Sequence, residues 1–336
     1  AFIGFLEDEG WLYSSGNNIS RVTKRDVLIA DDFKNFISDT NSDLTEDEVT
    51  QIFDNVRLVG SESDFATLHK VYGWMVDGVQ FTPQDGLARM IQLIDFENPD
   101  KNIFRVVNQF TVEYTNNGQK ENRRPDVLLF VNGMPLCVIE LKNPADANAT
   151  IYDAWEQINI RYWRDIPHLL HYCPLACISD GVKTRLGTVR TPYEHFYAWR
   201  RVNEGDAVST LPFEETETMI KGVYAPERFL EIFRDYIYFQ DSIYDSDEVE
   251  IVCRYPQFFA ARLLKQSIIN SVVQKSGKGG TYFGATGCGK TYTMAFLARQ
   301  LALRCTDIPE IGSPSIILIV DRDELQKQGA KLFTKS

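Results

Sequence analysis

The sequence contains no long apolar run, no closely paired cysteines and no excess of positive charge. No uninterrupted apolar stretch approaches the roughly 20 residues of a membrane-spanning helix, and no signal peptide is recognisable. The six cysteines are scattered without a C-x-x-C pair. Their scatter excludes the usual zinc and dithiol motifs and is typical of a reducing compartment. These absences predict a cytoplasmic protein that binds no membrane.

Positive charge is scarce because 35 Lys and Arg residues are outnumbered by 47 Asp and Glu residues, for a formal net charge of −12. A protein that binds nucleic acid over its whole surface would have the opposite balance. A local basic track within a larger assembly is still compatible with this composition. The length of 336 residues and the hydrophobic content of 44% predict two globular domains.

The most informative segment consists of two apolar runs, residues 127–131 and 136–141, separated by Asn132-Gly133. Continuous apolar runs of this length predict buried strands, and Asn-Gly between two such runs is typical of a hairpin turn. Upstream, residues 104–114 alternate in polarity and predict one strand that leads toward this hairpin.

Charged residues border the hairpin in a pattern that indicates catalysis. Glu140 and Lys142 are two residues apart, so on a strand they project from the same face. Asp126 precedes the first strand and can reach that face. Two carboxylates can hold Mg²⁺ for phosphodiester hydrolysis, and the ammonium can steady the attacking water or the charge of the transition state. The alternative is an exposed Glu–Lys pair that merely ends a core strand.

The register of the hairpin tests this interpretation. A two-residue turn at Asn132-Gly133 would pair Asp126 with Ile139 and place Glu140 on the opposite face. A three-residue loop with a bulge, and with Gly133 in the left-handed region, would pair Asp126 with Glu140. Because the chemistry requires the second register, we predict an odd-length loop.

These residues resemble a known family. Asp126 with Glu140-x-Lys142 resembles the PD-(D/E)xK nuclease signature. The longer pattern is similar to the R (motor and nuclease) subunit of type I restriction enzymes, and it is carried by Asn122–Asp126, Asn132–Pro135 and Glu140–Pro144. The resemblance implies that Asp126 and Glu140 bind Mg²⁺ and that the backbone carbonyl of Leu141 completes the shell.

A second motif lies far downstream. Residues 284–291 match G-x-x-x-x-G-K-[ST], after a predicted strand at 280–283 and before a predicted helix at 292–303. Backbone N–H groups of such a loop surround phosphates, the lysine reaches the β and γ phosphates, and the hydroxyl ligates Mg²⁺. The motif therefore predicts ATP binding by Gly284, Gly287, Gly289, Lys290 and Thr291.

Two further segments resemble superfamily 2 helicases. Residues 316–321 look at first like a Walker B strand, but the pattern V-D-R-x-x-L-x-x-Q from Val320 to Gln328 is more similar to motif Ia, which contacts the DNA backbone. Gln257 lies where a Q-motif glutamine would read adenine. On chemistry alone it is a helix-start residue with a structural role. Since no DEAD-type acid follows before Ser336, we expect only the front of an ATPase domain, without ATP turnover by this piece alone.

Residues 151–164 predict an amphipathic helix after the Glu-x-Lys strand. The restriction family has Q-x-x-x-Y on this helix in support of the active site. Here Gln157 is present, but Arg161 occupies the fourth position after it and Tyr162 follows. Either Arg161, facing phosphate, or Tyr162 is left to serve the motif.

Other basic residues are candidates for contacts with DNA phosphates, with ordinary surface solvation as the alternative. They are Arg124, Arg161, Lys183, Arg185 and Arg190. His168 and His171 are not expected to bind a metal because no adjacent glutamate or third ligand accompanies them. In the N-terminal region a capping box at Thr45 predicts a helix over 45–53, and a further helix is predicted over 82–94.

The predicted organisation is α/β. A PD-(D/E)xK nuclease-like domain over residues 1–202, with a mixed sheet flanked by helices, is followed by an acidic linker at 203–220. Residues 221–336 would form the first part of a truncated, RecA-like parallel α/β domain.

The resemblance implies Mg²⁺-dependent endonucleolytic cleavage coupled to ATP-driven translocation of duplex DNA. The partners would be the methylation and specificity subunits of a type I restriction complex, since no base-reading element is evident in the sequence. A free-standing nuclease-helicase and a non-cutting module that binds nucleotide and DNA are the alternatives.

Overall fold

The computed structural model describes residues 2–60, 62–84, 86–143, 150–211, 214–240, 248–305 and 308–319. The chain divides into two compact units, Ala1–Leu230 and Glu231–Ser336, and each is described by itself. No described helix is long and apolar enough to cross a membrane.

The first unit combines helices with a central sheet. Its helices and helical turns are α1 (Phe2–Asp8), η1 (Gly16–Asn18), α2 (Ala30–Thr40), α3 (Glu46–Arg57), α4 (Asp64–Asp77), η2 (Pro99–Lys101), α5 (Ile151–Glu156), η3 (Gln157–Tyr162), α6 (Trp163–Asp165), α7 (Pro167–Leu170), η4 (Tyr193–His195), α8 (Glu215–Met219) and η6 (Ile220–Tyr224). Its strands are β1 (Leu12–Ser15), β2 (Val79–Phe81), β3 (Arg89–Ile91), β4 (Phe104–Asn108), β5 (Val112–Asn116), β6 (Gln119–Arg123), β7 (Val127–Val131), β8 (Met134–Leu141), β9 (Leu175–Ser179) and β10 (Thr184–Thr188).

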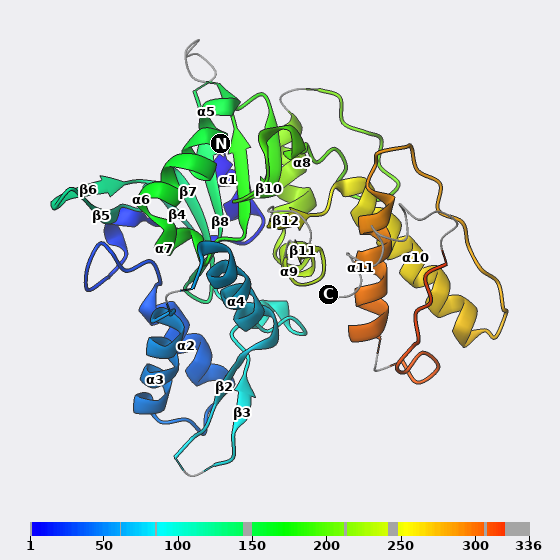
Figure 1. The fold of residues 1–336 in the computed structure, drawn as a ribbon, viewed down its shortest axis with the longest axis horizontal. Helices are drawn as coiled ribbons and strands as arrows, with labels where there is room; N and C mark the ends of the chain where they lie inside the picture. Colours follow the sequence, from blue (N-terminus) through cyan, green and yellow to red (C-terminus); the bar gives the residue numbers. More distant parts are fainter. Residues whose placement is uncertain are drawn as a thin grey trace. The chain divides into compact units, whose positions relative to one another are not determined.

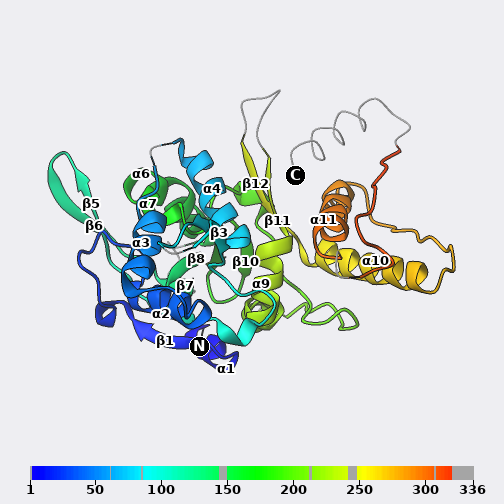
Figure 2. The same ribbon diagram turned by 90° about the horizontal axis from the view of Figure 1, so that it is seen from below.

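Six strands form the central sheet in the order β1-β4-β7-β8-β9-β10. β1 pairs parallel with β4 and β8 parallel with β9, and the other neighbours are antiparallel. Helices pack around the sheet, while the hairpin β5–β6 projects beyond it (Figures 1 and 2). The predicted mixed α/β arrangement, with a mixed sheet flanked by helices, is confirmed. The specific nuclease-like fold stays a prediction.

The two central strands explain the apolar runs of the sequence. Every residue of β7 is buried, and β8 is buried up to Glu140. A strand covered on both faces has no solvent side, so its sequence does not alternate in polarity.

The hairpin between β7 and β8 has the predicted register but not the predicted loop. Val131 pairs with Met134 across a two-residue turn, and Asn132 and Gly133 have φ of 49° and 76°. The odd-length loop is therefore wrong. The required shift comes instead from a bulge within β8, because Phe130 pairs with Pro135 whereas Leu129 pairs with Cys137. Leu136 is the extra residue, and it brings Asp126 opposite Glu140.

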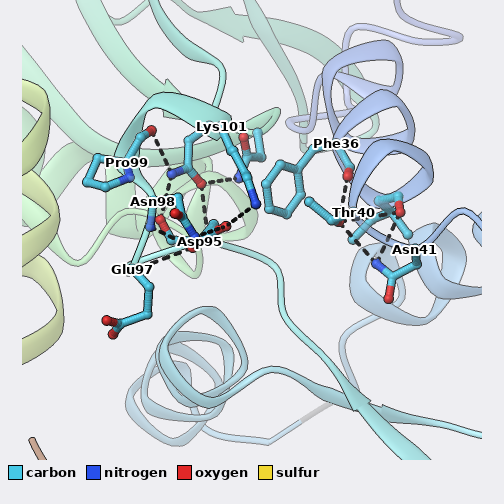
Figure 3. Close-up of polar contacts among 11 residues, drawn as sticks. Phe36, Thr40, Asn41, Asp95, Glu97, Asn98, Pro99 and Lys101 are labelled. Carbon is cyan, nitrogen blue, oxygen red and sulfur yellow. Dashed lines mark hydrogen bonds and ion pairs between the residues drawn. The ribbon is translucent and has the colours of Figure 1, made fainter.

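A buried amide holds the turn of this hairpin. Asn132 is fully buried, and its Oδ1 accepts from the N–H of Ile103 at 2.8 Å while its Nδ2 donates to Asn102 Oδ1 at 2.9 Å. Asn102 in turn belongs to a polar loop in which the Oδ1 of Asp95 accepts from the N–H of Asn98 at 2.9 Å (Figure 3). These bonds satisfy backbone groups that have no ladder partner.

The N-terminal predictions had mixed outcomes. The capping box is confirmed, because Thr45 and Glu48 exchange side-chain and backbone hydrogen bonds at the start of α3. The helix predicted over 82–94 is wrong, since the described part of that segment contains β3. The single strand predicted over 104–114 is also wrong. It breaks into β4 and β5 around Gln109, whose positive φ of 54° cannot continue a strand.

The second unit contains β11 (Ile237–Gln240), β12 (Val249–Val252), α10 (Tyr255–Val273) and α11 (Lys290–Leu303). The helix predicted after the phosphate-loop motif is confirmed as α11. Residues 280–283 and 316–319 form no strand, contrary to prediction, and the side chains of Phe283 and Ile319 are 92% and 87% exposed. A parallel strand is stabilised only by its neighbours, and no described strand lies beside these segments. Residues 320–328, with the predicted motif Ia, lie outside the described residues.

The predicted linker at 203–220 is partly structured. It contains α8, where Glu215 Oε2 accepts from the N–H of Thr184 at 3.0 Å and Thr216 Oγ1 lies 2.7 Å from Thr184 Oγ1. These contacts attach the segment to β10, and the first compact unit extends to Leu230. The assignment of nuclease and ATPase domains to the two parts of the chain stays a prediction.

Replacing Gly133 by alanine should destabilise the first unit. An added Cβ would lie 2.2 Å from the carbonyl oxygen of Ile29, at a φ of +76°. We expect a loss of about 2–4 kcal/mol from overpacking and backbone strain together. Urea unfolding followed by tryptophan fluorescence measures it, because all five tryptophans lie in this unit.

Gly118→Ala is the matched control. Gly118 has a φ of +79° with nothing within 4 Å of an added Cβ, so only the strain of about 1 kcal/mol should appear. Equal losses in the two variants would contradict the close packing of Gly133 against Ile29.

Candidate active site

Asp126 lies just before β7, in the position that the bulge creates. Its Oδ2 accepts from the backbone N–H of Leu141 at 2.9 Å, and its Oδ1 accepts from Gln109 Nε2 at 3.2 Å. Its own N–H donates to Glu140 Oε1 at 3.3 Å. The two predicted carboxylates are therefore brought together, and the carboxylate of Asp126 is held at both oxygens.

Glu140 is fully buried near the end of β8. Its Oε1 accepts from the hydroxyl of Tyr162 at 2.5 Å, and its Oε2 accepts from Gln157 Nε2 at 2.6 Å. Burial raises the pKa of this carboxyl well above its ordinary value, and the charge of Asp126 raises it further, while the Tyr162 hydrogen bond and Lys142 act in the opposite direction. The ionised form is costly here unless a cation lies nearby.

Gln157 connects Glu140 to Lys142. Its Oε1 accepts from Lys142 Nζ at 2.8 Å, while its Nε2 also approaches the oxygen of Tyr162 at 2.8 Å. The predicted residues Glu140, Lys142 and Gln157 thus form one hydrogen-bonded cluster, and Tyr162 belongs to it.

The helix geometry decides between Arg161 and Tyr162. Residues 157–162 form a π-helical segment, η3, in which backbone hydrogen bonds join residue i to i+5. A π turn therefore places the fifth residue after Gln157 above it, where an α-helix would place the fourth. The π turn thus compensates for the one additional residue between Gln157 and Tyr162, relative to the Q-x-x-x-Y spacing. Tyr162 points into the site, and Arg161 pairs with Glu156 at 2.6 Å on the surface.

The remaining candidates lie around this cluster. Arg124 is exposed two residues before Asp126. The N–H of Lys142 donates to Ser179 O at 2.7 Å, so the turn that carries exposed Lys183 begins beside the site. Arg185 lies half-buried on β10. Arg190 stacks over the rings of Phe65 and Trp163 at 5.3 and 5.6 Å, as a packing residue would.

The donor set fits a hard divalent cation. Asp126 and Glu140 supply carboxylate oxygens, and a positive ion would offset the repulsion and burial that raise the pKa of Glu140. Among the described residues no group of three or more His, Cys, Asp or Glu side chains could hold a metal. A bound ion would therefore need the carbonyl oxygen of Leu141 or water in addition, and the role of Leu141 stays a prediction.

The predicted phosphate-binding loop precedes α11. Gly287 and Gly289 have φ of 79° and 80°, which only glycine adopts readily. Lys290 Nζ donates to the carbonyl oxygens of Gly284 and Ala285 at 2.8 and 3.0 Å. Thr291 is the second residue of the helix.

Gln257 is buried against this loop. Its Nε2 donates to Gly289 O at 3.1 Å, and its Oε1 accepts from the N–H of Arg254 at 2.7 Å. The structure thus brings the predicted Q-motif residue to the predicted loop. Its amide positions the loop in this structure, and the reading of adenine stays a prediction.

Gln109 was missed from the sequence. It lies seventeen residues before Asp126 and touches it through both backbone and side chain, with its N–H 3.0 Å from Asp126 O. Nothing in the spacing of a lone glutamine signals such a contact.

Two family models match separate parts of the chain. Residues 2–195 match the family described as type I restriction enzyme R protein N terminus, and residues 256–336 match the SWI2/SNF2 ATPase family. The chain belongs to the type I restriction enzyme R protein family. The first match contains the whole carboxylate cluster, and the second contains the phosphate-loop motif.

Two relatives extend along nearly the whole chain. One, from Methanocaldococcus jannaschii, is named as the MjaIXP endonuclease subunit of a type I restriction enzyme and is 28% identical over 99% of this chain and 33% of its own length. The other, the type I restriction enzyme HindI endonuclease subunit of Haemophilus influenzae, is 29% identical over 98% of this chain and 32% of its own length. The chain spans about a third of the length of these relatives.

Deleting Arg161 should preserve the site. With one residue fewer, the segment can form a regular α-helix with Tyr162 four positions after Gln157, so the phenol should keep its bond to Glu140. We expect the free energy of unfolding of the chain to stay within about 1 kcal/mol of the wild-type value. Inserting one alanine after Ile158 should lower it by about 1–3 kcal/mol, because neither helix type accommodates that spacing and the buried Glu140 loses a hydrogen-bond partner. Equal losses in the two variants, measured by urea unfolding, would refute the role of the π turn.

The contribution of Glu140 to the stability of the metal-free chain should fall as the pH rises. Since the folded-state pKa of Glu140 lies above its ordinary value of 4.5, the protonated form is favoured in the folded state. The resulting stability is complete below the unfolded pKa and is lost as the pH rises through the folded pKa. In EDTA, urea unfolding should show the free energy of unfolding of Glu140→Gln rising relative to that of the wild type as the pH increases above 4.5. A constant difference would contradict the raised pKa.

Proposed function

We propose that this chain contains the DNA-cleaving site and part of the ATP-binding site of a type I restriction enzyme R subunit. The observation that carries the proposal is the cluster of Asp126, Glu140, Lys142 and Gln157 at the end of β8. It brings a carboxylate pair and an ammonium into one hydrogen-bonded cluster around the buried Glu140. The family membership of the chain supports the same reading.

Each residue of the cluster would have a separate role. Asp126 and Glu140 would hold Mg²⁺, with the carbonyl of Leu141. The ion, when bound, supplies Lewis-acid polarisation of the scissile phosphate and lowers the pKa of bound water. Lys142 would steady the attacking water or the negative charge that develops on the phosphate. Gln157 and Tyr162 hold the orientation of Glu140 through two short hydrogen bonds.

Exposed basic residues outside this cluster would contact the DNA backbone. Arg124 and Lys183 are exposed cations close in sequence or space to the catalytic residues, and they suit contacts with the phosphates of duplex DNA. Such contacts carry no sequence information, so the chain would cut where DNA is delivered to it.

The second unit would supply nucleotide binding. The left-handed glycines, Lys290 and Thr291 have the order that a phosphate-cradling loop requires. By the family resemblance the whole protein would use ATP to translocate duplex DNA, in a cytoplasmic complex with methylation and specificity subunits. The names of the relatives as endonuclease subunits of type I restriction enzymes are consistent with this assembly.

Replacement of Lys142 by alanine tests the cleavage site. In the assembled enzyme with Mg²⁺ and ATP, we expect DNA cleavage to fall by about 10²–10³-fold, the usual effect of removing one group that stabilises transition-state charge. ATP hydrolysis should be unchanged, because the phosphate-loop motif is intact. Gel assays of linear and nicked DNA, with ATPase rates in parallel, measure both.

Lys221→Ala is the matched control. Lys221 is an exposed lysine on η6, outside the candidate site, and its Nζ lies 2.5 Å from Glu217 Oε1. Its replacement should leave both activities intact. Full cleavage by Lys142→Ala and Asp126→Ala would overturn the nuclease assignment in favour of a non-cutting module. Purification of active enzyme without methylation and specificity subunits would favour a free-standing nuclease-helicase.

A further inference from the structure

Gln109 has a backbone conformation that glutamine rarely adopts. It follows the last residue of β4, and its φ of 54° lies in the left-handed region. Outside glycine and asparagine, such residues persist only where the surrounding structure fixes them, and they cluster at functional sites.

Close packing fixes this conformation. A Cβ on Gly16 would lie 2.6 Å from the carbonyl oxygen of Gln109 and 2.7 Å from the Cα of Phe110, so the two chain segments touch through their backbones. The ring of Phe110 is fully buried and lies 5.5 Å from that of Phe130 on β7. The kink is therefore held from both sides, independently of the glutamine side chain.

The left-handed backbone at Gln109 places two of its hydrogen-bond donors beside Asp126. The ladder between β4 and β7 ends with Asn108 opposite Val127. One step further, the N–H of Gln109 donates to Asp126 O at 3.0 Å, and its side-chain Nε2 donates to Asp126 Oδ1 at 3.2 Å. With Oδ2 held by the N–H of Leu141 at 2.9 Å, the carboxylate of Asp126 cannot rotate without losing a bond.

We propose that Gln109 is a positioning residue that orients the Asp126 carboxylate for metal binding. The proposal rests on the proposed function of Asp126 as a metal ligand. A partner that fixes the orientation of a ligating side chain raises affinity by reducing the freedom that binding must remove. The left-handed backbone is what lets a residue at the end of β4 serve the neighbouring strand.

Gln109→Gly isolates the side chain from the backbone. Glycine adopts a φ of 54° without strain, so the backbone bond to Asp126 O is kept while the amide is lost. The affinity of the 336-residue chain for Mn²⁺ should fall by about tenfold, as for other partners of metal ligands. The electron paramagnetic resonance signal of the free ion measures this affinity. Cleavage by the assembled enzyme should need correspondingly more Mg²⁺ for half its maximal rate, with ATP hydrolysis unchanged.

Asn117→Gly is the matched control. Asn117 is also a non-glycine residue of positive φ, at 48°, and it is exposed in the turn of the β5–β6 hairpin. Its replacement should leave Mn²⁺ binding and the Mg²⁺ requirement at the wild-type level. If Gln109→Gly loosens the fold, as tryptophan fluorescence would show, Gln109→Asn gives the same test. Asparagine tolerates the conformation, and its shorter side chain places the amide one carbon further from Asp126.

The outcomes separate this inference from the proposed function. Weak Mn²⁺ binding in Asp126→Ala together with wild-type binding in both Gln109 variants would overturn the positioning role and leave the metal site standing. Wild-type binding in Asp126→Ala would remove the metal site and this inference with it. Weakened binding in both Gln109 variants, but not in Asn117→Gly, supports the proposal.

Discussion

The bulge at Leu136 sets the register on which the contacts between the two carboxylates depend. Without the extra residue, the turn at Asn132 and Gly133 would pair Asp126 with Ile139 and direct Glu140 to the other face of the sheet. With it, Asp126 bonds to the backbone of Leu141 and offers its own N–H to Glu140. The buried turn amide and the tight packing of Gly133 fix the turn of this hairpin, and the bulge then sets the register of the strand beyond it.

A second extra residue, in the π-helical segment, plays the same part on the neighbouring helix. Both insertions shift a functional side chain by one position without changing the direction of the element that carries it. Local irregularities of this kind are compatible with many loop and helix sequences, which is why they are hard to foresee. The sequence predicted that Asp126 must face Glu140, because the chemistry requires it. It did not predict where the extra residue lies, because a bulge has no residue signature comparable to Asn-Gly in a turn.

Features set by local sequence patterns were the easier ones to predict. The apolar runs of β7 and β8, the capping box at Thr45 and the helix after Lys290 all follow from local patterns that the fold retains. The failures lie where long-range contacts override local preference. Residues 104–114 alternate like one strand, yet the packing of Gly16 against Gln109 bends the chain between β4 and β5. Residues 280–283 have a strand-like composition, but a strand also needs a neighbour.

Gln157 has a consequence for the charges of the site. One end of its amide accepts from the ammonium of Lys142, and the other donates to the carboxylate of Glu140. When Glu140 is ionised, this neutral amide lies between its carboxylate and the ammonium of Lys142, so the two charges are kept from forming a direct pair. A direct pair would neutralise both partners before a substrate arrived. Because the amide of Gln157 lies between them, the ammonium of Lys142 can still interact with a phosphate and the carboxylate of Glu140 can still bind a cation.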